Sequence, residues 1–343
     1  IVSYASGNFM ILDSSTRRNL ELLETMREKQ KRGSLLWVLD KTRTAMGARL
    51  LRNWIEQPLI NREDILKRQQ AIEELNLNYI SREELGEYLN PIYDLERLIS
   101  RISYKSANPR DLLAFCGSIE MVPYIKTLLK EFTSENLKVL EGQLDGLEDL
   151  KDLISRAIVE EPPITVREGG IIREGFSEEA DRLRQAKTEG KTWLAELEAQ
   201  ERENTGIKSL KVKYNRVFGY YFEVTNSFKD LVPDYFIRKQ TLTNAERYTT
   251  DKLKDLESVI LGAEDKLFSL EYDLFCQVRD AVGAQVVRIQ QTARAIAEID
   301  VYASLSTVAT RNNYVKPSIN ERGTIQIKGG RHPVVEKMMR DDL

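Results

Sequence analysis

Hydrophobic positions in the first half of the chain repeat at helical spacing. The apolar residues after Thr44 recur at intervals of three and four and predict one buried helical face. They are Met46, Leu50, Leu51 and Trp54. Asn108 before Pro109 is typical of a helix start, because proline is tolerated at the first helical position. Prolines and glycines at 162–175 end the pattern, so residues 1–176 are predicted to form a helical bundle with its own core.

Two long polar stretches, residues 177–206 and 244–315, each carry a narrow apolar seam. Steps of three and four are typical of paired helices. The seam residues are Leu183, Ala186, Gly190, Trp193 and Leu197 in the first stretch, and Leu253, Leu256, Ile260, Ala263, Leu267, Leu270 and Leu274 in the second. We interpret Thr243 and Glu246 as the capping box of the second helix. A helix from 244 to about 300 would be roughly 85 Å long, which predicts an antiparallel stalk that returns to the bundle.

Residues 207–243, between these stretches, have a period of two. Leu210, Val212 and Tyr214 alternate with polar residues, and residues 218–225 and 236–242 are further candidate strands. The predicted fold is therefore mainly α. It has a helical bundle core and two long antiparallel lever helices that carry a small antiparallel β-sheet. Residues 316–343, with a strand-like Thr324–Ile327, are interpreted as the start of a further domain.

Charge changes this picture, because it is uneven along the chain. The net charge is −3, so any affinity for nucleic acid must be local. Residues 204–248 hold eight lysines and arginines against four acids, a charge of +4, which leaves −7 for the rest. The same segment holds nine of the 27 aromatic residues. A basic stalk tip on an acidic protein favours a polyanionic partner.

The cations of the insert have a spacing that suits DNA. Ser209, Lys211, Lys213 and Asn215 fall on one strand face, about 6–7 Å apart, close to the phosphate spacing of about 7 Å. Such contacts position a protein on DNA without reading its sequence. The predicted helix start at 243–245 would add free backbone N–H groups as an anion site. The alternative, that these residues are only the solvated face of a small sheet, stays open.

The sequence gives little support for a nucleotide, metal or catalytic site. Gly190-Lys191-Thr192 lacks the upstream glycine of a phosphate loop, because Gln185 stands there. The single histidine, His332, excludes histidine triads and HExxH zinc sites, and we expect it to be a turn or packing residue. Glu168 and Glu174 are expected to be solvated loop acids. We therefore expect no catalytic residue, cofactor or metal site in this chain.

Cellular context is only weakly marked. Two cysteines, Cys116 and Cys276, form no disulfide framework and fit a reducing cytoplasm. No uninterrupted apolar run approaches the roughly 20 residues that span a bilayer, and no signal peptide is recognised, so no membrane partner is expected. Both ends of the sequence are interpreted as fragment boundaries.

Several motifs resemble the MutS family of DNA mismatch-repair proteins over essentially the whole chain. The resemblance to the core domain of that family lies in residues 12–22, 33–40, 46–51, 94–98 and 108–112. Its clamp is resembled by residues 205–212, Asn215, residues 218–221 and residues 238–248, and the entry to its ATPase domain by residues 330–336. The motif set favours a bacterial mismatch-repair member over a meiotic one.

The resemblance implies more than the pattern does. MutS proteins are dimers that encircle duplex DNA, with two lever helices carrying each clamp. Mismatch recognition belongs to an N-terminal domain with a Phe-x-Glu motif, and ATP and Mg²⁺ belong to a C-terminal ATPase domain. Neither is expected in this chain, so no enzyme activity is expected of it. A MutL-type partner and a cytoplasmic, nucleoid-associated location are expected of the intact protein.

The resemblance and the charge pattern together predict the DNA-backbone contacts. They are Lys208, Lys211, Lys213, Asn215, Lys239, Gln240, Asn244 and Arg247. The expected parts are a core at 1–176, levers at 177–206 and 244–315, a clamp at 207–243 and an ATPase start at 316–343. The alternative is a stalked coiled-coil scaffold that binds a protein partner at its tip.

Overall fold

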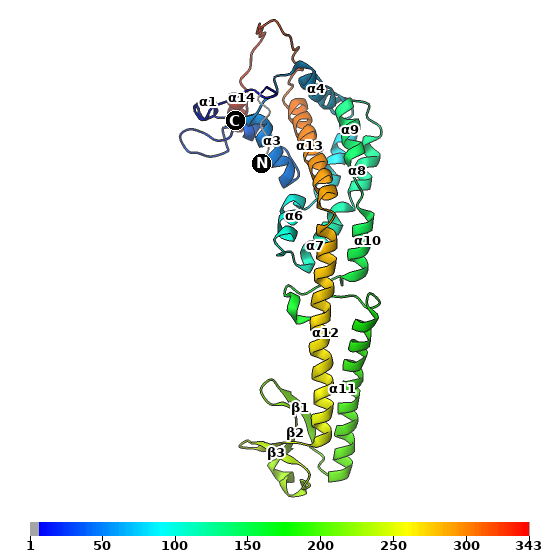
Figure 1. Ribbon diagram of the computed structural model, residues 1–343. Coiled ribbons are helices and arrows are strands. Elements are labelled where there is room, and N and C mark those ends of the chain that lie inside the picture. Colours follow the sequence, from blue (N-terminus) through cyan, green and yellow to red (C-terminus); the bar gives the residue numbers. More distant parts are fainter. Residues whose placement is uncertain (1–6, 343) are drawn as a thin grey trace. The chain divides into compact units, whose positions relative to one another are not determined.

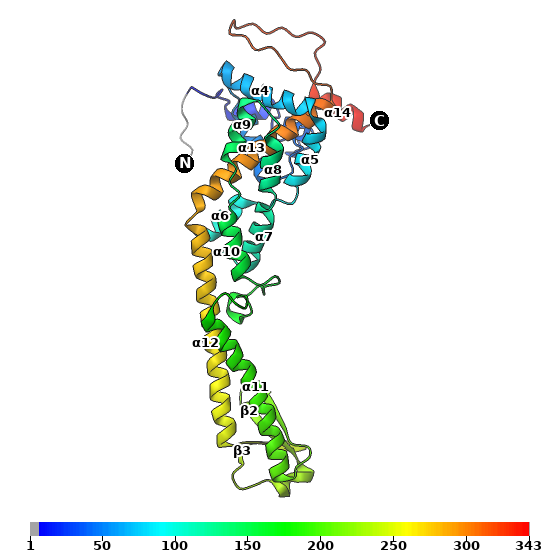
Figure 2. The same ribbon diagram turned by 90° about the vertical axis from the view of Figure 1, so that its right-hand side faces the viewer.

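The computed structural model describes residues 7–342, which group into two compact units (Figures 1 and 2). The helical unit comprises residues up to 107, residues 111–155 and residues from 279 onward. The stalk unit comprises residues 108–110 and 156–278. The fold is mainly α with one small antiparallel sheet, as the sequence predicted.

The helical unit is built from short and medium-length helices around α13. Its helices are α1 (Ser14–Asn19), α2 (Leu35–Leu39), α3 (Ala45–Glu56), α4 (Arg62–Leu77), α5 (Tyr79–Leu89), α6 (Leu95–Ser103), α7 (Pro109–Ile119), α8 (Val122–Leu129), α9 (Glu135–Gln143), α10 (Glu148–Ala157), α13 (Val286–Arg311) and α14 (Pro333–Asp341). The first residues of α7 and the last of α10 are grouped with the stalk unit. Helix α7 begins at Pro109, as predicted.

The core of the helical unit forms around α13, which is buried on nearly every side between Ala295 and Ser304. It contacts α2, α3, α4, α5, α6 and α9. Tyr302 is fully buried and meets the edge of Trp54, with ring centroids 5.4 Å apart. The buried carboxylate of Asp300 accepts hydrogen bonds from the backbone N–H of Arg43 (2.9 Å) and of Thr44 (2.8 Å). These bonds fix the start of α3 against α13.

The stalk unit is built on α11 (Glu178–Thr205) and α12 (Asp251–Gly283), whose last turn is grouped with the helical unit. Arg184 pairs with Glu271 (3.2 Å) and Lys187 with Glu264 (3.5 Å), so partner numbers fall on α12 as they rise on α11. The helices are therefore antiparallel, and both views show them side by side (Figures 1 and 2). A short 3-10 turn, η1 (Val166–Glu168), precedes them.

A four-stranded antiparallel sheet joins the two long helices. Its strands are β1 (Lys211–Asn215), β2 (Gly219–Thr225), β3 (Ile237–Thr241) and β4 (Ala245–Thr249), in the order β1-β2-β4-β3, with η2 (Asn226–Leu231) between β2 and β3. One sheet face packs against both helices. Phe222 and Tyr248 share a buried cluster with Leu197 of α11 and with Leu253 and Ile260 of α12. Their burial stabilises the attachment of the sheet.

The predicted start of the second long helix is wrong. Thr243 does not cap a helix, and Glu246 lies in β4, a strand that the sequence analysis missed. Helix α12 begins at Asp251, where the Thr250 hydroxyl accepts a hydrogen bond from the backbone N–H of Leu253 (3.2 Å). Thr243 and Glu246 imitate a capping box, but pairing with β2 and β3 satisfies more backbone groups in this segment.

A single helix from 244 to 300 is also wrong, because the chain leaves the helix at Ala284 and Gln285. Gly283 ends α12, and a Cβ at that position would lie 3.0 Å from the Ile102 side chain. Close packing therefore favours glycine here, and glycine has a low helix propensity. The break separates α12 from α13.

Two finer predictions also differ from the structure. Trp193 was placed in the seam of α11, but it is 40% exposed while Leu194 is 7% exposed. Gly190, Leu194 and Leu197 are the buried positions of this part of α11, so the seam runs through Leu194 and not through Trp193. Residues 324–327 form no strand within the described chain, and Ile325 is 90% exposed.

One stretch, Pro109–Leu129, is apolar and long enough to pass a composition test for a membrane span. In the structure it is two helices, α7 and α8, and half of its most apolar window is buried. Core helices of folded proteins pass the same test, so the stretch is weak evidence for a membrane segment.

Candidate nucleic-acid interface

The sheet has an open face opposite the packed one. Residues facing each other across antiparallel strands project to the same side. Lys211 faces Glu223, Glu223 faces Arg247, and Arg247 faces Gln240. The register therefore brings polar and charged residues of all four strands onto what we call the open face. These residues are Lys211, Lys213, Asn215, Glu223, Gln240 and Arg247.

Three cations along β1 and its flanking turns are exposed and have no acidic partner among residues 7–342. They are Lys208, before β1, Lys211, on β1, and Arg216, after it. The sequence analysis chose the first two, and Arg216 was counted only in the local charge. Lys211 faces Glu223 across the β1–β2 pair but forms no ion pair with it, and no ion pair involves Lys208 or Arg216 among the described residues. These three cations are therefore free to bind an anion.

Two other predicted contacts are already paired with one acid. Lys213 forms an ion pair with Glu223, and the Arg247 Nε lies 3.9 Å from a Glu223 oxygen. Arg247 Nη1 also donates to Gln240 Oε1 (2.9 Å), and its guanidinium lies 4.5 Å from the centre of the Tyr221 ring. Positive charge is therefore gathered on the open face, but Glu223 offsets part of it.

Asn215 shapes the turn between β1 and β2. Its Oδ1 accepts hydrogen bonds from the backbone N–H groups of Val217 (2.8 Å) and Phe218 (3.3 Å). Gly219, which follows, has φ +75°, a region that favours glycine. The Asn215 oxygen is used inside the protein, so its amide N–H₂ is the part left for an external partner.

The remaining predicted contacts come from β3 and the turn after it. The Lys239 ammonium donates to the backbone carbonyl of Phe218 (2.7 Å). Asn244 lies in the β3–β4 turn, where the N–H of Leu242 donates to the carbonyl of Ala245 (2.8 Å). No helix begins in this turn, so the anion site expected at a helix N-terminus there is wrong.

The two long helices hold the sheet through buried and half-buried side chains that the sequence analysis did not identify. A Glu198 oxygen of α11 accepts from the N–H of Val212 (2.9 Å), and a Glu257 oxygen of α12 accepts from the N–H of Tyr220 (2.9 Å). Tyr235 donates to buried Glu201 (2.6 Å), and burial with this bond raises the Tyr235 pKa to about 12. These bonds orient the sheet on the helices of the stalk unit.

Glu246 gathers a second set of cations away from the open face. It lies 3.2 Å from the Lys229 ammonium and 4.0 Å from the Arg238 guanidinium, and it accepts a hydrogen bond from the Tyr248 hydroxyl. That bond and the two cations lower the pKa of Glu246, while burial and Glu246 raise the pKa of Tyr248 to about 12. Lys229 and Arg238 are thus partly neutralised.

Comparison with known proteins decides the family. A family model described as MutS domain III matches residues 15–306. The chain belongs to the MutS family. It is 64% identical over its whole length to the DNA mismatch repair protein MutS of Lachnoclostridium phytofermentans. It is 56% identical to MutS of Ruminiclostridium cellulolyticum and 53% identical to MutS of Acetivibrio thermocellus, each over 98% of the chain. The chain spans 37–39% of the length of these three relatives.

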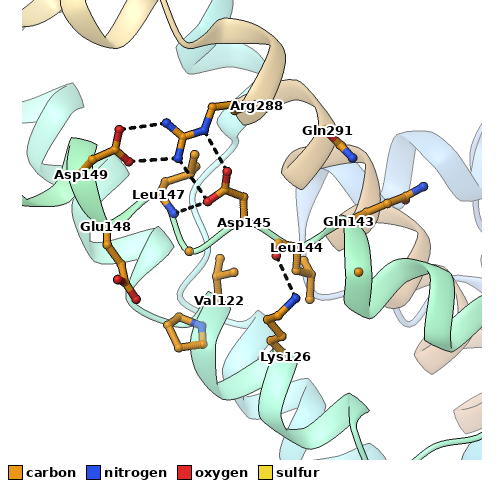
Figure 3. Close-up of a pocket in the computed structure, with 13 residues that line it drawn as sticks. Val122, Lys126, Gln143, Leu144, Asp145, Leu147, Glu148, Asp149, Arg288 and Gln291 are labelled. Atoms are coloured by element: carbon orange, nitrogen blue, oxygen red, sulfur yellow. Dashed lines mark hydrogen bonds and ion pairs between the residues drawn. The ribbon is translucent and has the colours of Figure 1, made fainter.

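The helical unit of this MutS-family chain has an open hollow of about 640 Å³ around Arg288 (Figure 3). Arg288 binds Asp145 (2.9 Å) and Asp149 (2.9 Å), and these bonds lower the pKa of both carboxyls. The nearby Lys126 ammonium donates to the backbone carbonyls of Glu141 (2.6 Å) and Leu144 (3.3 Å). Arg288, Asp145, Asp149 and Lys126 are bound to each other or to the backbone, and the remaining charged group at the rim, Glu148, is exposed, so the hollow gives no evidence of a ligand site.

The residues that the sequence analysis considered for a phosphate loop, a histidine site or an acid pair are packed in helices, cap a helix or are exposed to solvent. Gly190-Lys191-Thr192 lies inside α11, and His332 caps α14 by accepting from the N–H of Val335 (3.3 Å). Glu168 and Glu174 are exposed. Cys116 and Cys276 are free thiols. Among residues 7–342, no group of three or more histidine, cysteine, aspartate or glutamate side chains could hold a metal ion.

Proposed function

We propose that this chain is the part of a bacterial DNA mismatch-repair protein that holds duplex DNA by its backbone. The observation that carries the proposal is the open edge of β1, where Lys208, Lys211 and Arg216 are exposed without an acidic partner among the described residues. This edge belongs to a segment of charge +4 in a chain of net charge −3. Phosphates are the anions that such a row of cations suits.

Alternate residues on a strand are about 6.6 Å apart, close to the spacing of DNA phosphates. The open face would therefore bind successive phosphates and make no base-specific contact. In the proposal, Lys208, Lys211, Lys213, Asn215, Lys239, Gln240, Asn244 and Arg247 are the backbone contacts. Arg216 joins them because it shares the exposure of Lys211.

The larger setting is part of the same proposal. Residues 1–176 would be the core, residues 177–206 and 244–315 the levers, and residues 207–243 the clamp, with residues 316–343 opening an ATPase domain. The levers would relay between DNA and that domain, to which ATP and Mg²⁺ belong. The intact protein would act as a homodimer with a MutL-type partner in the cytoplasm. This chain would contribute no catalytic residue.

The test is DNA binding by the full-length protein carrying Lys211→Glu and Lys213→Glu. Loss of two phosphate contacts should weaken binding and reduce the slope of log Kd against log salt by roughly 1–2. Fluorescence anisotropy with a labelled duplex at several salt concentrations measures both. Single changes sharpen the test: Lys211→Gln should weaken binding more than Lys213→Gln, because Lys213 is already paired with Glu223.

Lys191→Glu is the matched control, since Lys191 is exposed on α11 and lies outside the sheet. It should leave the salt slope close to that of the unchanged protein. If the Lys211→Glu, Lys213→Glu protein binds duplex DNA as tightly as the control does, the proposed interface is wrong.

The second candidate is a scaffold that binds a protein partner at the sheet. It is favoured by apolar side chains exposed around the sheet, with Val217 81% and Tyr235 52% exposed. Salt separates the two candidates. Binding to DNA through phosphates should weaken steeply with salt, whereas a protein partner held by apolar contacts should be retained at high salt.

A further inference from the structure

Glu223 occupies the middle of the open face. It lies on β2, opposite Lys211 of β1 on one side and Arg247 of β4 on the other. Its side chain, 21% exposed, pairs with Lys213 and lies 3.9 Å from Arg247 Nε. The other acid on the four strands, Glu246, faces Val224 and Thr241 and therefore points to the packed side.

We propose that Glu223 is a built-in competitor for DNA phosphate that sets the strength and salt dependence of binding at the open face. The inference rests on the proposed function, because it needs phosphates to arrive there. Glu223 and a phosphate attract the same two cations, Lys213 and Arg247. A phosphate that binds either cation must draw it away from the carboxylate and approach a like charge.

A phosphate can take the place of Glu223 beside these cations without disrupting the sheet. Glu223 is held in β2 by backbone pairing to both neighbouring strands, which does not use its carboxylate. Arg247 has other support, since it bonds to Gln240 and lies over Tyr221. Its Nε is buried and has no hydrogen-bond partner among the described residues. The attraction between Glu223 and Arg247 is therefore not a hydrogen bond, so a phosphate that binds Arg247 breaks no hydrogen bond between these two residues.

Glu223 would therefore make DNA binding at the open face weaker and more reversible. A protein that binds DNA by its backbone must also release it, and each added phosphate contact makes binding tighter and more salt-dependent. An acid among the cations lowers the affinity while the cations stay in position. Lys208, Lys211 and Arg216, which Glu223 does not pair with, would make the first contacts.

The experiment compares two changes that each remove one negative charge from the full-length protein. Glu223→Gln keeps the side-chain shape on the open face. Asp234→Asn removes an exposed acid of the same segment, outside the strands. By anisotropy, Glu223→Gln should bind a labelled duplex roughly 3- to 10-fold more tightly at low salt, with a slope steeper by about 1. Asp234→Asn should change neither clearly.

A second arm tests whether Glu223 acts through its two partners. In a protein that carries Lys213→Met and Arg247→Met, adding Glu223→Gln should give a clearly smaller gain, because only the direct repulsion between Glu223 and the phosphate is then left to remove. Equal affinity and slope for Glu223→Gln and Asp234→Asn would overturn the proposal, and so would an undiminished gain in the Met background. Glu223→Thr, which also suits a strand, repeats the test if the glutamine variant folds poorly.

The two proposals fail in different ways. Unchanged binding by the Lys211→Glu, Lys213→Glu protein removes the DNA interface itself. Weakened binding by that protein, together with an unaltered slope for Glu223→Gln, removes only the role of Glu223.

Discussion

Gly190 of α11 lies against Ile260 of α12 so closely that a Cβ at position 190 would be 2.4 Å from Ile260 Cγ1. Real Cβ atoms do not approach that closely, and both residues are buried. The glycine that begins Gly190-Lys191-Thr192 therefore has a packing role: it lets the two long helices come together.

Gly190→Ala should destabilise the stalk unit by roughly 1–3 kcal/mol, because the added methyl forces the helices apart. This loss should exceed the gain of about 1 kcal/mol that alanine has over glycine in a helix. Urea unfolding followed by circular dichroism measures it. Gly262→Ala on α12 is the matched control, since no described atom lies within 4 Å of its Cβ position. It should stabilise the protein, and equal effects of the two changes would contradict this packing account.

Gly219→Ala should be more damaging than Gly206→Ala. Both glycines have positive φ, +75° and +74°, so alanine is strained at either position. A Cβ at 219 would also collide with the Glu257 carboxylate, which would have to move and lose its hydrogen bond from the N–H of Tyr220, whereas no neighbouring side chain lies within 4 Å of one at 206. We expect a cost of about 1 kcal/mol at 206 and roughly 1–3 kcal/mol more at 219.

Thermal unfolding compares the two glycine variants. Adding Glu257→Ala to Gly219→Ala tests the clash, because it removes the atom that the new methyl would meet. The double variant should lose less stability than the sum of the single changes. Strict additivity would show that Glu257 is not the obstacle.

Acid should weaken the stalk unit through Glu246. The pKa of Glu246 is lowered below its ordinary value of 4.5, first by the Tyr248 hydroxyl and then by Lys229 and Arg238. A lowered pKa in the folded state stabilises the fold above about pH 4.5, and this contribution disappears as pH falls through the folded-state pKa. Relative to Glu246→Gln, the unchanged protein should therefore lose its advantage between pH 4.5 and more acidic values.

Thermal unfolding of both proteins from neutral pH to about pH 3 measures this difference. Tyr248→Phe removes the largest cause of the shift, so its pH dependence should lie between the two. A constant difference between Glu246→Gln and the unchanged protein across this range would contradict the role assigned to Glu246.

The strands show which elements a local sequence pattern can predict and which it cannot. Residues 211–215 and 219–225 were predicted because alternation and aromatic residues are local signals, and both strands formed. Residues 245–249 were not predicted, because Thr243 and Glu246 match a helix cap equally well. What decided for a strand was pairing with β2 and β3, which no local window contains.

Part of the candidate site could likewise be predicted from the sequence, and part could not. The excess of cations in residues 204–248 can be counted, so the sequence was enough to place it. The pairing of Lys213 and Arg247 with Glu223 depends on strand register and could not be counted. The length of the β1–β2 turn sets the register of this hairpin and is the signal in the sequence that bears on the distance between Lys213 and Glu223.

The amino-acid sequence by itself determined the mainly α fold, the two long helices, the β-rich insert and the gathering of positive charge in it. Each of these follows from residue types and spacing within a short stretch of chain, where backbone geometry sets the period. Only the tertiary structure decided where the second long helix begins and breaks, which seam residue is buried, and which cations keep their charge unopposed. These depend on contacts between residues distant in sequence, because packing and cross-strand pairing outweigh local preference wherever the two conflict.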